Sequence, residues 1–241
     1  MRMKTLITAL SLSAVAMAAS ASALAGAGKW PYDGASGHAS LTYTDKGSDI
    51  TAVGFQGGYG NLSQNLGGWI WDASASYVTV DSARDSDWGY ALSGDIGYRF
   101  ANVVRGVDLD LLGGITMESE TVEIDGSDVP LMPPSTAKYE TTWAKLGVGF
   151  FAQATPTTDI RFEMGLKEAL DASVEISMYR SAGVGYRDNL DKGELRTTYA
   201  GLSARFLNQA RFPILASLVA SQSSPYGASN NAMMLTVGLE F

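Results

Sequence analysis

Hydrophobic and polar residues alternate with a period of two along most of the chain. In the segment 87–100, "DWGYALSGDIGYRF", one set of alternate positions is apolar throughout and the other is small or charged. This pattern predicts a β-strand with one apolar and one polar face. The pattern recurs between clusters of turn residues and predicts ten strands. They span residues 37–46, 49–60, 67–80, 87–100, 106–119, 138–153, 159–170, 194–207, 211–222 and 230–241.

The positions of the aromatic residues favour a membrane barrel over a soluble sheet. On the apolar face of segment 87–100 the rings lie near both ends, from Trp88 to Tyr98, with smaller residues between them. Ten residues of strand measure about 33 Å, or about 25 Å along the membrane normal at a tilt near 40°. This height matches the apolar band of an outer-membrane barrel with aromatic rings at both interfaces. The expected aromatic girdle is Trp69, Trp71, Tyr77, Trp88, Tyr90, Tyr98 and Phe100.

The predicted connections differ in length between the two ends of the strands. Short turns such as "TPTT" and "NQAR" fall at one end, whereas the other end includes the long stretches 120–137 and 171–193. Bacterial outer-membrane barrels show this asymmetry. The sequence therefore predicts an all-β fold, a single up-and-down antiparallel transmembrane β-barrel of ten strands, with eight as the alternative. Its short turns and both termini would be periplasmic and its long loops extracellular, and the alternation within 171–193 allows a hairpin above the membrane.

The N-terminus has the three-part pattern of a secretory signal peptide. Arg2 and Lys4 precede an apolar run that is followed by small residues up to Ala25. The alternative, a transmembrane anchor, would need an apolar run of about 20 residues, and this run is shorter. We expect a signal peptide at 1–25, a periplasmic lead at 26–36 and the barrel at 37–241.

The composition argues against nucleic acid as a partner and against disulfide bonds as a source of stability. The full sequence has a net charge of −8, and residues 1–25 hold two of its 17 basic residues and none of its 25 acidic residues. Such an acidic chain is a poor partner for nucleic acid, which attracts clustered Lys and Arg. The chain has no cysteine, so barrel closure or a large core must stabilise it without disulfides.

The face opposite the apolar one carries charges of both signs, and it would line the lumen. Unpaired charges in so confined a space would be costly, so we expect these side chains to pair or to stay hydrated. The expected lumen network is Asp72, Asp95, Arg99, Asp108, Asp110, Lys145, Arg161, Glu163, Lys167 and Arg205.

The chain ends on "MLTVGLEF", in which apolar residues alternate up to a final aromatic residue. Together with the strand pattern over residues 37–241, this ending resembles that of small bacterial outer-membrane β-barrel proteins. The resemblance implies that the outer-membrane assembly machinery recognises the last strand, which then closes the barrel against the first. The residues at the matching positions are Leu235, Val237, Leu239 and Phe241.

The sequence offers little that suggests catalysis. Barrel enzymes such as lipid A deacylases and omptin-like proteases need a His beside Ser, Asp or Glu near the outer rim. The single His, His38, falls near the periplasmic end of the first strand. Asp108 and Asp110 lie on one face of a strand about 6.6 Å apart. With Arg99 and Lys145 nearby, they favour a structural ion network over acid–base chemistry or ion passage.

No cofactor or metal site is expected. The acidic stretch "ESETVEIDGSDVPLMPPS", residues 118–135, lacks the ordered spacing of a dedicated calcium loop. Solvated loop charge is the simpler explanation, and bridging to lipopolysaccharide through divalent ions is a secondary hypothesis.

The sequence therefore predicts a monomeric, non-enzymatic outer-membrane protein with a largely closed, ion-paired lumen. Its role would be structural or would lie in surface interactions of the long loops, and its partners would be outer-membrane lipid, lipopolysaccharide and the assembly machinery. The first alternative is a narrow porin-like channel for small solutes, because ten strands enclose a bore slightly wider than the eight that side chains can fill. A soluble exported barrel of the lipocalin type is a further alternative.

Overall fold

The computed structural model describes residues 35–45, 51–62, 67–81, 86–124, 135–178, 185–189, 195–207, 212–223 and 230–241. Its strands form one antiparallel sheet. The strands are β1 (Ser36–Asp45), β2 (Thr51–Gly60), β3 (Gly68–Asp81), β4 (Ser86–Val104), β5 (Val107–Ile124), β6 (Ser135–Thr155), β7 (Thr158–Met178), β8 (Gly185–Asn189), β9 (Arg196–Phe206), β10 (Ile214–Ser223) and β11 (Asn230–Glu240).

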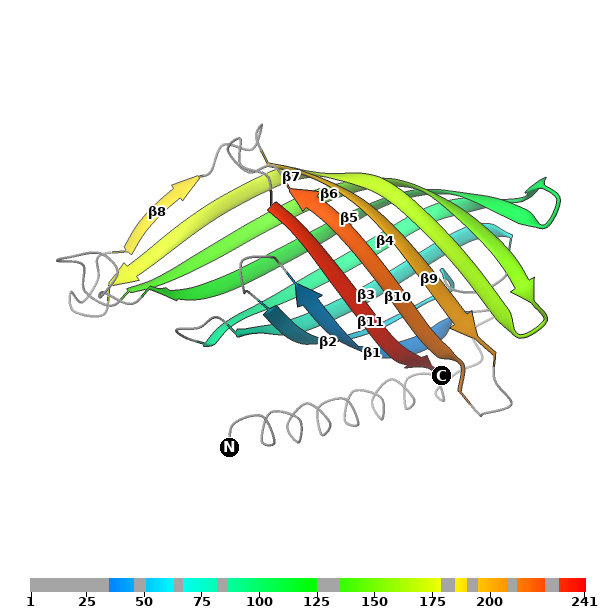
Figure 1. The fold of residues 1–241 in the computed structure, drawn as a ribbon. Helices are drawn as coiled ribbons and strands as arrows, with labels where there is room; N and C mark the ends of the chain where they lie inside the picture. Colours follow the sequence, from blue (N-terminus) through cyan, green and yellow to red (C-terminus); the bar gives the residue numbers. More distant parts are fainter. Residues whose placement is uncertain are drawn as a thin grey trace.

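Ten of these strands close into an up-and-down barrel, which confirms the predicted fold and strand number (Figure 1). From β1 to β7 each strand pairs with the next, β7 then pairs with β9, and the ring closes where β1 pairs with β11. At this seam the register runs from His38 opposite Glu240 to Asp45 opposite Met233. Closure gives both edges of each barrel strand a partner, so none of the ten is an edge strand.

The chain ends at the rim of the barrel that carries the short turns. Residues 105–106 connect β4 to β5, and residues 156–157 connect β6 to β7. At the same rim the N–H of Gly37 donates to the carbonyl of Phe241 at 2.9 Å, and the N–H of Phe241 donates to the carbonyl of Gly37 at 2.8 Å. We call this end the short-turn rim and the opposite end the long-loop rim.

The barrel has an apolar exterior and a polar interior. Outward-facing Leu92, Ile96 and Leu146 are 53%, 59% and 68% exposed, respectively. Inward-facing Arg99 and Asp110 are only 1% and 0% exposed. Soluble proteins show the opposite distribution, so the alternation seen in the sequence separates a lipid-facing surface from a charged lumen.

Strand β7 is longer than the sequence predicted. Its predicted end was residue 170, but the strand continues to Met178, and residues 185–189 of the expected loop form β8, which pairs with β7. The register between β6 and β7 shifts at Leu170. Thr142 of β6 pairs with Asp171 and the next residue, Trp143, pairs with Ala169, so Leu170 is an extra residue in β7. A bulge of this kind changes the phase of the alternation. Beyond it, β7 and β8 form a hairpin of the kind that the alternation within 171–193 allowed.

The other expected long loop is also partly strand. Strand β5 continues to Ile124 and β6 begins at Ser135, and these two residues are paired. The remainder of that stretch, residues 125–134, lies outside the described residues.

The far ends of β5, β6 and β7, together with β8, project beyond the other strands at the long-loop rim (Figure 1). Strand β9 begins opposite Glu168 of β7, so the last residues of β7 extend past it and pair with β8 instead. We call residues 120–124, 135–141, 171–178 and 185–189 the protruding sheet.

The predicted signal peptide and most of the predicted lead fall within residues 1–34, which lie outside the described residues. Over the part of the chain that the structure describes, no helix is long and apolar enough to cross a membrane.

Candidate functional site in the barrel lumen

The centre of the lumen site is an ion pair between Arg99 of β4 and Asp110 of β5. Arg99 Nε lies 2.6 Å from Asp110 Oδ1, and Arg99 Nη2 lies 2.8 Å from Asp110 Oδ2. The two residues are directly opposite each other in the strand register, which sets up this bidentate geometry. The guanidinium also lies 4.0 Å from the ring centroid of Phe151 on β6, a cation–π contact. The charge of Arg99 is therefore compensated although water is excluded.

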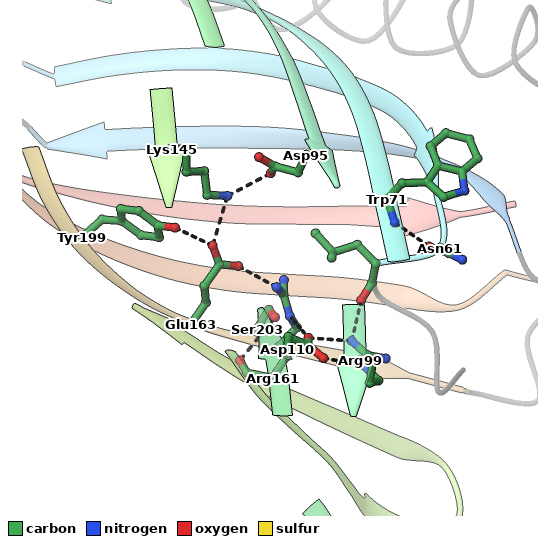
Figure 2. Close-up of polar contacts among 11 residues, drawn as sticks. Asn61, Trp71, Asp95, Arg99, Asp110, Lys145, Arg161, Glu163, Tyr199 and Ser203 are labelled. Atoms are coloured by element: carbon green, nitrogen blue, oxygen red, sulfur yellow. Dashed lines mark hydrogen bonds and ion pairs between the residues drawn. The ribbon is translucent and has the colours of Figure 1, made fainter. Parts of the chain in front are cut away.

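Further ion pairs continue from Asp110 along the barrel wall (Figure 2). Arg161 Nε lies 3.0 Å from Asp110 Oδ2, and Arg161 Nη2 lies 2.8 Å from Glu163 Oε2. Lys145 Nζ then lies 3.0 Å from Glu163 Oε1 and 2.8 Å from Asp95 Oδ2. With Arg99 this makes a chain of alternating cations and anions with no net charge, carried by β4, β5, β6 and β7. We call these six residues the central ion chain.

Tyr199 of β9 joins the central ion chain from the other side. Its hydroxyl donates to Glu163 Oε1 at 2.7 Å, as Figure 2 shows. Two glycines provide the space for this reach, because a Cβ at Gly147 or Gly165 would lie 2.6 Å or 2.5 Å from the Tyr199 hydroxyl oxygen. Both glycines thus accommodate one aromatic side chain.

A second cluster lies at the short-turn rim and crosses the barrel seam. Arg205 of β9 pairs with Asp159 of β7 at 3.3 Å and with Glu240 of β11. The hydroxyl of Ser36, at the start of β1, donates to the same Glu240 carboxylate. The cluster thus connects the first and last strands of the barrel through side chains, in addition to the backbone pairing of the seam.

Asp72 and Lys167, also predicted to line the lumen, lie outside the central ion chain and contact other residues. Asp72 lies opposite Asp95 in the register, and its carboxylate is 3.6 Å from His38 Nδ1. Lys167 Nζ is 3.8 Å from Glu118, whose carboxylate also accepts from the Trp143 indole N–H at 2.9 Å.

Asp108 lies outside the central ion chain. Its carboxylate accepts the backbone N–H of Asn102 at 2.7 Å, beside the turn between β4 and β5. Asn102 has a positive φ of 55°, an uncommon conformation that Asn adopts more readily than most residues. The carboxylate of Asp108 therefore binds local backbone beside the turn and lies outside the central ion chain.

Residues that the structure describes line two cavities in the lumen. A cavity of about 210 Å³ lies towards the short-turn rim, where His38, Asp159 and Arg205 contribute to its lining. A cavity of about 630 Å³ lies towards the long-loop rim and is lined by Trp143, Tyr199, several charged residues and many hydroxyl groups. The hydroxyl-bearing residues around the larger cavity are Thr44, Ser74, Ser76, Ser93, Thr116, Thr197, Ser203, Ser217, Ser221, Ser223 and Thr236.

The predicted girdle residues lie on the outer face, and most of them contact another member of the girdle. Trp69 packs edge to face on Tyr98 with 5.6 Å between ring centroids, and Tyr77 stacks on Trp88 at 6.3 Å. Trp71 contacts Tyr59, which the sequence interpretation did not include. The remaining two members, Tyr90 and Phe100, contact Trp88 and Tyr98, respectively.

The last strand presents its apolar residues outward. Leu235, Val237 and Leu239 are all about half exposed. The ring of Phe241 covers Gly37, where an added Cβ would lie 2.5 Å from a ring carbon.

The sequence interpretation missed several residues of the lumen. Glu240 is inward-facing and 2% exposed, and it could have been found because it alternates with the outward residues of the last strand. Asp159 and Tyr199 could have been found by the same alternation. Leu62 lies in the β2–β3 turn and lines both cavities, and no periodic signal in the sequence marks it. Among the described residues, no cluster of three or more His, Asp or Glu side chains could hold a metal ion.

Known structures share this fold. The chain is similar to the translocator domain of the autotransporter NalP from Neisseria meningitidis, with a TM-score of 0.52 and 11% identity over 97% of this chain and 97% of that chain. It is similar to the outer membrane protease OmpT from Escherichia coli, with a TM-score of 0.52 and 9% identity over 86% of this chain and 93% of that chain. No protein-family model and no curated relative matches the sequence. The chain thus has the fold of bacterial outer-membrane β-barrels, as its resemblance to the small members of that class implied.

Proposed function

We propose that the protein is an exported, integral outer-membrane β-barrel without catalytic activity. Its lumen is largely closed by ion pairs, and its role is structural or lies in contacts made at the long-loop rim. The observation that carries this proposal is the central ion chain, whose members are inward-facing while large apolar side chains cover the exterior.

The exterior supports insertion into a bilayer. Exposed apolar residues surround the barrel, and aromatic pairs lie at two levels, Trp69 with Tyr98 and Tyr77 with Trp88. Aromatic residues at two levels are typical of the two membrane interfaces. In this orientation the short-turn rim and both termini are periplasmic and the long-loop rim is extracellular. A soluble lipocalin-type barrel would leave this apolar surface in water, at a large cost in free energy.

The interior supports a closed lumen. The central ion chain fixes side chains of β4, β5, β6 and β7 against one another, and Tyr199 adds β9 to the same network. Each charge has at least one partner of opposite sign within 3.0 Å. Movement of one member would leave its partners buried and unpaired, so we expect the arrangement to be rigid.

The protruding sheet supports a role at the cell surface. It raises four paired strand segments above the rest of the long-loop rim. Its outer face carries an exposed ion pair, in which Lys138 Nζ lies 2.7 Å from Glu140 Oε1. We expect this sheet and the two long stretches that it carries to contact lipopolysaccharide or a surface partner, and we expect the barrel to act as a monomer. Recognition of the last strand by the assembly machinery belongs to the same proposal.

Gel mobility and bilayer recordings test the proposal. The purified protein should migrate differently before and after boiling, and it should leave a planar bilayer silent. Extraction from membranes by salt alone would contradict the integral location, and large, frequent conductance steps would contradict the closed lumen.

The second candidate is a narrow channel for small solutes. It is favoured by the two luminal cavities, which share several lining residues. Reproducible steps in wild-type recordings that change size with Arg161→Gln would favour this candidate, because Arg161 lines both cavities.

A further inference from the structure

The two luminal cavities meet at one level of the barrel. Six wall residues of the described chain line both cavities, and each comes from a different strand. They are Gln56 of β2, Asp72 of β3, Arg161 of β7, Ser203 of β9, Ser217 of β10 and Thr236 of β11. We call this set the boundary ring. On the remaining side, Arg99, Asp110 and Phe151 are buried and fill the space next to the wall.

Among the described residues, Leu62 is the only other one that lines both cavities, and it differs from the boundary ring in origin and chemistry. It belongs to the turn after β2 and not to a barrel strand. Of the described residues that line both cavities it is the only apolar one, because the six wall residues are all polar or charged. An apolar side chain from a turn therefore lies where the two cavities meet.

The neighbouring residue Asn61 holds this turn against the barrel wall. Its side-chain oxygen accepts the N–H of Trp71 at 2.8 Å, and its side-chain nitrogen donates to the carbonyl of Trp69 at 3.2 Å. Its backbone N–H donates to the carbonyl of Trp71 at 2.9 Å. Asn61 is 7% exposed, so these three bonds fix the turn at a position from which water is largely excluded.

The turn is also attached to the central ion chain. Arg99 Nη2 donates to the carbonyl of Leu62 at 3.2 Å while the same guanidinium binds Asp110. The backbone of Leu62 is therefore positioned from two sides, by the Asn61 contacts with β3 and by the buried guanidinium.

We propose that Leu62 is the constriction residue of the lumen, and that its side chain keeps water and small solutes from passing between the two cavities. The inference rests on the closed lumen proposed above and assigns the closure to one residue. Ion pairs alone leave the wall polar and wettable, whereas an apolar side chain at a narrow point disfavours a continuous water column. The central ion chain and Asn61 act as positioning groups for Leu62.

Bilayer recordings of Leu62→Ser test the proposal, with Leu92→Ser as the matched control. Leu92 faces outward and is 53% exposed, so its substitution removes the same side chain without altering the lumen. We expect a gain of resolvable conductance steps for Leu62→Ser and silence for Leu92→Ser and the wild type. A heat-dependent gel shift establishes that each variant is folded. A folded Leu62→Ser barrel that stays silent would overturn the assignment and leave the closed-lumen proposal intact.

The absence of cysteine from the natural sequence allows a reversible version of the experiment. Leu62→Cys should open the barrel, a bulky thiol-specific methanethiosulfonate reagent should close it again, and a reductant should restore the conductance. The same reagent should leave a Leu92→Cys barrel unchanged. A Leu62→Cys current that the reagent does not alter would overturn the proposal. If the wild type itself conducts, the closed-lumen proposal is wrong. In that case a higher conductance for Leu62→Ser than for the wild type would still support Leu62 as the constriction residue, and an unchanged conductance would overturn it.

Discussion

Arg99 and Asp110 form a bidentate ion pair in which both side chains are fully shielded from solvent. The pair joins β4 to β5, and the same carboxylate also binds Arg161. A buried charge that loses its partner keeps its desolvation cost, so this pair should be among the least replaceable features of the barrel.

Asp110→Asn should lower the free energy of unfolding by about 3–5 kcal/mol, because it leaves the guanidinium of Arg99 buried without its carboxylate. Urea titration of the folded barrel in lipid vesicles, followed by tryptophan fluorescence, measures the change. Asp108→Asn is the matched control, because that carboxylate accepts the backbone N–H of Asn102 and lies outside the central ion chain. Equal losses for the two variants would mean that the ion pair has no special role.

Gly165→Ala should destabilise the barrel by about 1–3 kcal/mol, a typical cost of overpacking. Its added methyl group would collide with the carbonyl of Leu146 and with the Tyr199 hydroxyl. Gly94→Ala provides the control, because no atom lies within 4 Å of the added Cβ at that position. The same urea titration should show little or no loss for Gly94→Ala, and a loss as large as that of Gly165→Ala would argue against specific crowding around Tyr199.

Deletion of Phe241 should impair closure of the barrel seam. The deletion removes both backbone hydrogen bonds to Gly37 and the ring that covers that glycine. Folding into pure lipid vesicles, scored by the gel shift, should become slower and less complete. Phe241→Ala keeps the backbone bonds, so it should fold better than the deletion in vesicles. If Phe241→Ala folds normally in vesicles but fails in cells, the ring serves recognition by the assembly machinery.

The sequence predicted the barrel well because the strand signal is local. Each strand faces lipid on one side and the lumen on the other, so its alternation survives without knowledge of its neighbours. The prediction was wrong at the end of β7, where the extra residue Leu170 shifts the alternation. Beyond the bulge, β7 and β8 form a hairpin of the kind that the alternation within 171–193 allowed.

The arrangement of side chains in the lumen was harder to predict from the sequence. Alternation identifies which charged residues face inward, but their pairing depends on register and side-chain reach. Arg161 illustrates this point, since it bridges Asp110 on another strand and Glu163 on its own. Leu62 had no signal at all, because its position depends on how Asn61 binds β3.

The central claim is that the apolar face of each strand lies in lipid, and a pair of arginine substitutions tests it most directly. Outward-facing Ile115 lies opposite Gly94, between the levels of Trp88 and Tyr98, whereas outward-facing Val104 lies beside the short-turn rim. In vesicles, Ile115→Arg should lower the free energy of unfolding by about 2–4 kcal/mol and Val104→Arg by about 0–1 kcal/mol, because the cost of a charge depends on depth in the membrane. Equally small losses at the two positions would contradict the claim that this surface faces lipid.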